Sequence, residues 1–107
     1  MRSEQGRADD LQEDEPRIQD NPELNRYEVY VGSVLAGFTD YHSQPGLVTL
    51  KYTEVDPAFE GRGIGSRLVA GVLDDIRARG AAVLPICPFV RTYLQRHPEY
   101  ADLVTLG

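Results

Sequence analysis

The chain has 107 residues, 41% of them hydrophobic, and a formal net charge of −6 at pH 7. This length allows one small domain with a single core. The absence of a basic stripe argues against nucleic acid, and no apolar run is long enough to span a membrane. With one cysteine, Cys87, and two histidines, we expect no internal disulfide and no metal site. No signal peptide is apparent, so we expect a cytoplasmic protein, most simply a monomer.

The negative charge is concentrated at the N-terminus. Residues 1–24 contain eight acids and three arginines, whereas residues 25–107 contain nine acids and eight bases. The first segment has no aromatic residue and too few aliphatic ones to offset its chain entropy. We therefore predict a disordered acidic tail over residues 1–24 and a single folded domain over residues 25–107.

The first half of the predicted domain reads as three strands, over residues 26–31, 34–41 and 47–55. The first is rich in strand formers and places Tyr27, Val29 and Val31 on one face. Gly32-Ser33 has the chemistry of a hairpin turn, and Gly37 indicates a bulge in the second strand. The three strands should form an antiparallel meander.

The second half alternates helix and strand. Apolar residues at a spacing of four, starting from Ile64, predict a helix over residues 65–79 that ends at Gly80. Residues 82–87 should form a fourth strand parallel to the third, because a crossover helix precedes it. Pro85 cannot donate to a sheet ladder, so one side of that strand should be unpaired or splayed. A short helix follows over residues 89–97, and then an irregular tail.

Three alternating glycines, Gly61, Gly63 and Gly65, join the third strand to the first helix. They allow sharp turns and close approach of a ligand, and the helix N-terminus supplies unpaired N–H groups for an anion such as phosphate. The loop lacks the Gly-Lys-Ser/Thr of a P-loop, and Ser66 stands where a dinucleotide fingerprint has its third glycine. A plain glycine turn without a ligand is the structural alternative.

Three segments in combination resemble the GNAT acetyltransferase superfamily, in its minimal single-domain branch. They are Thr53-Glu54-Val55 with the loop Phe59-Glu60-Gly61-Arg62-Gly63-Ile64-Gly65-Ser66, Cys87-Pro88-Phe89-Val90 with Tyr93, and His97-Pro98-Glu99-Tyr100. The resemblance implies a GNAT-like α/β (α+β) mixed sheet. It also implies that acetyl-coenzyme A (acetyl-CoA) binds in a wedge between the third and fourth strands.

The resemblance also implies roles for individual residues. The cofactor-binding candidates are Val55, Glu60, Gly61, Arg62, Gly63, Ile64, Gly65, Ser66 and Pro88. Glu60 is a departure, because the family usually has Gln or Arg there. Glu54 is the candidate general base, and Tyr93 is the candidate acid for the departing thiolate. Cys87, the expected N-cap of the last helix, either carries the acetyl group as a nucleophile or lines the thioester pocket.

Two functions from different classes follow from this resemblance. The first is an N-acetyltransferase that moves acetyl from acetyl-CoA to an amine acceptor, either a small molecule or a protein amine. The alternative is a coenzyme A-binding module without turnover. A third interpretation is an α/β interaction domain that binds no cofactor.

Overall fold

The structure, a computed structural model, describes residues 15–105. Its strands are β1 (Arg17–Asn21), β2 (Arg26–Val31), β3 (Val34–Gln44), β4 (Leu47–Val55) and β5 (Ala82–Pro85), and its α-helices are α2 (Ile64–Ala78) and α3 (Pro88–Arg96). Two 3₁₀ helices, η1 (Pro57–Phe59) and η2 (Pro98–Leu103), complete the chain. The predicted order of strands and helices is confirmed, with one strand added at the start.

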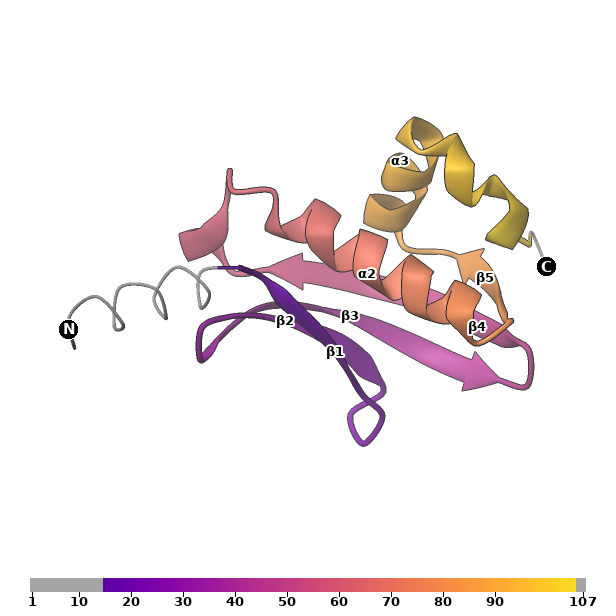
Figure 1. The fold of residues 1–107 in the computed structure, drawn as a ribbon, viewed down its shortest axis with the longest axis horizontal. Coiled ribbons are helices and arrows are strands. Elements are labelled where there is room, and N and C mark those ends of the chain that lie inside the picture. Colours follow the sequence, from indigo (N-terminus) through magenta and orange to yellow (C-terminus); the bar gives the residue numbers. More distant parts are fainter. Residues whose placement is uncertain (1–14, 106–107) are drawn as a thin grey trace, which may run out of the picture.

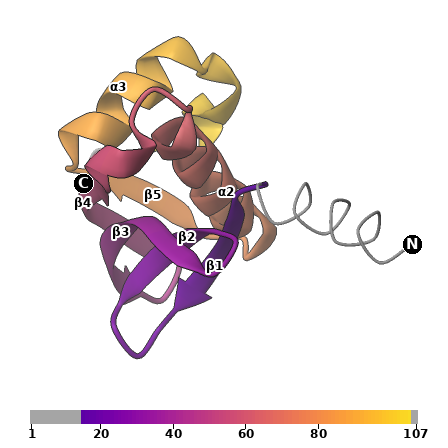
Figure 2. The same ribbon diagram turned by 90° about the vertical axis from the view of Figure 1, so that its left-hand side faces the viewer.

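The five strands form one sheet in the order β1-β2-β3-β4-β5. Neighbours from β1 to β4 are antiparallel, and β5 runs parallel to β4 as expected for a strand that follows a crossover helix. The helices α2 and α3 lie on one side of this sheet (Figures 1 and 2), and its other side is left open in the described part of the chain. The mixed α/β class predicted from the sequence is therefore correct.

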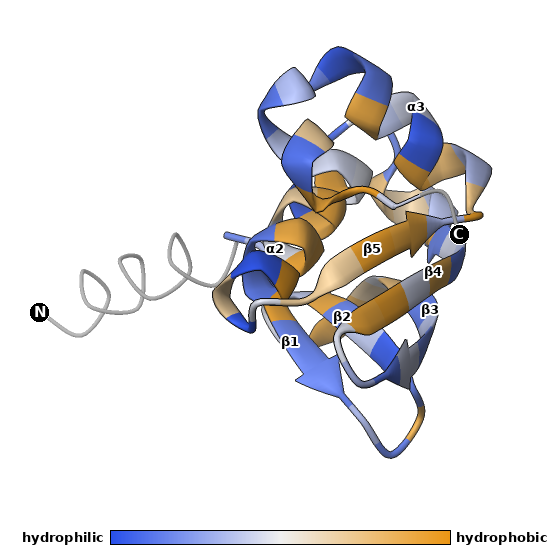
Figure 3. Cartoon of the chain, turned by 90° about the vertical axis from the view of Figure 1, so that its right-hand side faces the viewer, coloured by the Kyte–Doolittle hydropathy of each residue, from blue (hydrophilic) through white to orange (hydrophobic). Residues whose placement is uncertain are grey.

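The core lies between α2 and the sheet. The apolar stripe of α2 is buried at Ile64, Leu68, Val72 and Ile76, as its spacing predicted. On β2, alternate residues Tyr27, Val29 and Val31 are buried in the same core. Figure 3 shows hydrophobic residues where α2, β4 and β5 face one another. Each fully buried large aliphatic side chain contributes roughly 1.5–3 kcal/mol, so this layer holds the helix to the sheet.

The prediction of a disordered tail over residues 1–24 is wrong from Arg17 onward. Arg17–Asn21 forms β1, which pairs with β2 along its whole length. Its one aliphatic side chain, Ile18, packs where Gly71 of α2 has no Cβ, and a Cβ there would lie 3.1 Å from Ile18. An edge strand with a single, partly buried aliphatic side chain leaves almost no apolar pattern in the sequence. Residues 1–14, also assigned to the tail, lie outside the described residues.

Two bulges set which side chains face the helices. Between β2 and β3 the register shifts at Ala36, next to Gly37, where a bulge was expected. Between β3 and β4, Asp40 pairs with Tyr52 and Tyr41 with Leu50, which leaves Lys51 as the extra residue. The sequence did not indicate this second bulge. Because it reverses the alternation of side chains, Leu50 and Thr53 both face the helix layer.

The strands β4 and β5 separate after a short pairing. Only residues 47–50 of β4 pair with β5, whose strand ends at Pro85 rather than at Cys87 as predicted. Beyond that point the amides of Ile86 and Cys87 both donate to the carbonyl oxygen of Leu50, at 3.1 and 3.0 Å. Residues 51–55 of β4 therefore have no strand partner on this side among the described residues.

The open side of the sheet carries a buried carboxylate. Glu28 is 2% exposed and accepts hydrogen bonds from Arg26 Nε (2.8 Å), Asn21 Nδ2 (3.0 Å) and the Tyr30 hydroxyl (3.0 Å). Burial alone would raise the pKa of Glu28, but these three donors outweigh it and hold the pKa below its usual range. Glu28 therefore stays ionised and joins β1 to β2.

Removing Arg26 should leave this carboxylate short of a partner. We expect Arg26→Ala to lower the free energy of unfolding at pH 7 by about 2 kcal/mol, measured by urea denaturation. A carboxyl with a depressed pKa stabilises the fold above its unfolded pKa of about 4.3 and loses that contribution as pH falls. The difference between Arg26→Ala and the parent should therefore shrink on acidification.

The matched control is Arg17→Ala, an exposed arginine on the same face whose guanidinium lies 5.3 Å from the centre of the Tyr30 ring. Its loss should change stability by no more than about 0.5 kcal/mol. A difference between Arg26→Ala and the parent that does not depend on pH would contradict the assignment to Glu28.

Candidate functional site

A groove of about 380 Å³ opens where β4 leaves β5. It runs from the unpaired end of β4 to the glycine loop at the start of α2. The residues that line it are Thr53, Val55, Phe59, Glu60, Gly61, Gly63, Ile64, Gly65, Ser66 and Phe89. The groove thus collects seven of the nine residues predicted to bind a cofactor; Arg62 and Pro88 are not in its lining.

The loop presents free backbone donors to this groove. Gly61 and Gly63 have φ of 81° and 72°, a conformation that side chains disfavour, and Gly63 is the N-cap of α2. This cap makes no side-chain hydrogen bond, and the first turn of α2 contains no acid. The N–H groups of the first turn therefore remain available, at the positive end of the helix dipole. Such an arrangement suits a phosphate group.

Gly65 is needed for a different reason. Its backbone is helical, but a Cβ at this position would lie 2.5 Å from Cζ of Phe89. The Phe89 ring therefore rests on the first turn of α2 and forms one wall of the groove. Phe89 comes from the start of α3, so the groove depends on packing between residues far apart in the sequence.

The charged residues near the loop have mixed signs. Glu60 lines the groove and is exposed, so its carboxylate can turn away from a bound anion. The guanidinium of Arg62 lies 5.2 Å from the centre of the Phe59 ring, and Phe59 is itself part of the lining. Arg62 thus stands beside the groove, while Pro88 occupies the first turn of α3.

Cys87 is the N-cap of α3, as expected, and is only 2% exposed. Its Sγ donates a hydrogen bond to Oγ1 of Thr53, 3.3 Å away. Thr53 in turn lies 3.0 Å from Oγ1 of Thr39 on β3. The thiol therefore lies behind the groove wall and reaches the groove through Thr53.

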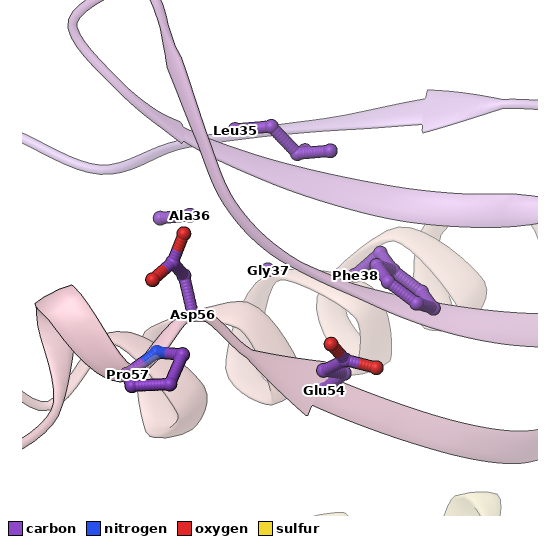
Figure 4. A pocket seen from close by; sticks show the side chains of 7 residues that line it. All are labelled: Leu35, Ala36, Gly37, Phe38, Glu54, Asp56 and Pro57. Carbon is purple, nitrogen blue, oxygen red and sulfur yellow. The ribbon is translucent and has the colours of Figure 1, made fainter.

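Glu54 follows Thr53 on β4 but points to the opposite side of the sheet. There it lines a pocket of about 220 Å³ together with Phe38 and Asp56 (Figure 4). Its carboxylate is exposed and accepts a hydrogen bond from the Tyr52 hydroxyl at 3.0 Å. The burial expected for a general base is absent in this structure.

Tyr93 lies outside the groove, in a neighbouring pocket of about 100 Å³ that shares Ser66 and Phe89 with it. Its ring stacks on His97 with 3.9 Å between the ring centres. Burial, with the nearby carboxylates Glu99 and Asp74, raises the pKa of Tyr93. The structure therefore places the three predicted catalytic residues in three different environments.

The sequence did not indicate Thr53, Phe59 or Phe89 as lining residues. The orientation of Thr53 depends on the bulge at Lys51, which has no clear sequence signature. Phe89 carried one signal, an aromatic residue directly after a helix-starting proline, but its contact with Gly65 depends on how α3 packs on α2.

Among the described residues, no helix is long and apolar enough to cross a membrane. No three side chains of His, Cys, Asp or Glu in residues 15–105 gather closely enough to hold a metal ion.

Comparison with known proteins agrees with the fold. A search of curated proteins found no match. Among solved structures, the fold is similar to that of a GCN5-like candidate N-acetyltransferase from Staphylococcus aureus, determined by NMR. The two share 18% sequence identity with a TM-score of 0.64, over 83% of this chain and 87% of that chain, which confirms the GNAT-like fold. The family model for GCN5-related N-acetyltransferases matches residues 26–103, and the chain therefore belongs to this family.

Proposed function

We propose that the protein binds acetyl-CoA in the groove and transfers the acetyl group to an amine. The observation that carries the proposal is the continuity of the groove, which joins the free N–H groups at the start of α2 to the unpaired edge of β4. A diphosphate suits the free N–H groups at the start of α2, and an extended chain with amide groups suits the unpaired edge of β4. Coenzyme A has these two parts next to each other.

The acceptor is proposed to approach from the open side of the sheet. The pocket on that side has two carboxylates, Glu54 and Asp56, an aromatic ring, Phe38, and no basic residue in its lining. Such surroundings favour a protonated amine over an anion. In this role Glu54 takes the proton that the amine must lose before it attacks the thioester.

The alternative is a module that binds coenzyme A without turnover. The exposure of Glu54 and the position of Tyr93 outside the groove both favour it, because neither residue has the setting of a developed catalytic group. The two functions share the cofactor and differ in whether acetyl-CoA is consumed when amines are present.

Coenzyme A should stabilise the protein. At a free concentration 100 times its dissociation constant it should raise the free energy of unfolding by about 2.7 kcal/mol, measured by thermal or urea denaturation. Gly63→Ala should abolish most of this gain, because a methyl group there stands where the phosphates must approach.

The control for that substitution is Gly46→Ala in the turn between β3 and β4. Both glycines have positive φ, 72° and 76°, and a Cβ at either position would meet no atom within 4 Å beyond the adjacent residues. Each substitution should cost about 1–2 kcal/mol of stability, but only Gly63→Ala should lose the response to coenzyme A. No stabilisation of the parent by millimolar coenzyme A would refute both candidate functions.

Glu54→Gln separates the enzyme from the binding module. With a panel of primary amines, we expect the substitution to lower the rate of acetyl transfer about 100-fold and to leave coenzyme A affinity unchanged. If Glu54→Gln transfers acetyl at the parental rate across the pH range, Glu54 is not the base.

The burial of Cys87 favours direct transfer over a covalent intermediate. Incubation with acetyl-CoA alone should leave the intact mass of the protein unchanged, and Cys87→Ser should retain transfer within a few-fold of the parent. In direct transfer Tyr93 stays the candidate acid, and Tyr93→Phe should slow the reaction. An acetyl adduct on Cys87 that hydroxylamine removes and that forms as fast as turnover would establish the intermediate instead.

A further inference from the structure

Three side chains, from β3, from β4 and from the N-cap of α3, form a short series of hydrogen bonds behind the groove. The Cys87 thiol donates to Oγ1 of Thr53 over 3.3 Å, and the hydroxyl oxygens of Thr53 and Thr39 are 3.0 Å apart. Thr39 is fully buried and Cys87 almost so, whereas Thr53 is half-buried and lines the groove. Of these three hydrogen-bonded side chains, Thr53 is thus the one that a ligand in the groove can contact.

Burial fixes the direction of the bond between the two threonines. Among the described residues, the Thr39 hydroxyl has Thr53 as its one hydrogen-bond partner. If Thr53 donated to Thr39, the Thr39 proton would be left unpaired in the core, at a high cost for a buried donor. Thr39 therefore donates to Thr53, as Cys87 does.

The Thr53 oxygen then accepts two hydrogen bonds, which fill both of its lone pairs. Its own proton has no partner among the described residues and cannot turn back toward Thr39 or Cys87. Because Thr53 itself lines the groove beside the unpaired edge of β4, this proton can turn into the groove. The protein thus holds a hydroxyl donor in a fixed orientation at the unpaired edge of β4.

We propose that Thr53 donates this hydrogen bond to the thioester carbonyl oxygen of bound acetyl-CoA. The inference rests on the proposed function and adds a residue that polarises the acyl group. Attack by an amine moves negative charge onto that oxygen, so a donor fixed in advance binds the transition state more tightly than the ground state. Thr39 is a positioning residue, because it acts by fixing the Thr53 hydroxyl.

The test is the infrared band of the thioester carbonyl in protein-bound acetyl-CoA labelled with ¹³C at that carbon. A hydrogen bond lowers the frequency of this band. We expect Thr53→Val and the smaller Thr53→Ala to move the band to higher frequency than in the parent, and Thr53→Ser to restore it. Acetyl-CoA affinity, measured by calorimetry on the same samples, should change less than threefold in Thr53→Ser.

Thr49→Val is the matched control, since it makes the same change on the same strand at a residue that does not line the groove. It should leave the band where the parent has it. An unchanged band in Thr53→Val or Thr53→Ala, with acetyl-CoA still bound, overturns the inference and leaves the proposed function intact. Failure of the parent to bind acetyl-CoA overturns both.

Discussion

The site depends on one backbone event, the separation of β4 from β5 after Leu50. The Leu50 carbonyl oxygen accepts hydrogen bonds from two successive amides, those of Ile86 and Cys87. The segment after β5 then turns away from the sheet into α3. Pro85, which has no N–H, ends the ladder, and Pro88 starts the helix within three residues. The separation leaves five residues of β4 unpaired on one edge, and this edge forms half of the groove.

The other half of the groove is held in place by the core. The stripe of α2 buried against the sheet fixes the axis of that helix, and therefore the position of its free N–H groups relative to β4. Phe89 then closes the wall by resting on Gly65, where a side chain would collide with its ring. Neither the loop nor the strand edge makes the site alone. Both are positioned by apolar packing between α2, α3 and the sheet.

The sequence was sufficient where a local pattern determines the structure. The apolar spacing that starts at Ile64 located α2 to within one residue, because a helix repeats every 3.6 residues. The glycines located the loop, because positive φ favours glycine. It failed where the structure depends on partners distant in sequence. Strand β1 contains a single aliphatic residue, Ile18, and the bulge at Lys51 follows from the register of two strands. Without that bulge, neither the face of Thr53 nor that of Glu54 could be assigned.

Thr53 and Glu54 are adjacent on β4 and point to opposite sides of the sheet. If β4 were paired along its whole length, the side chains of Thr53 and Glu54 could not reach the same ligand group, because the neighbouring strand would separate the two sides of the sheet. The unpaired edge of β4 removes that barrier. If Thr53 polarises the thioester and Glu54 deprotonates the amine, the acyl group must lie at this edge, with the cofactor on the helix side and the acceptor on the open side. The same separation of strands that admits the cofactor would then also expose its acyl group to the acceptor.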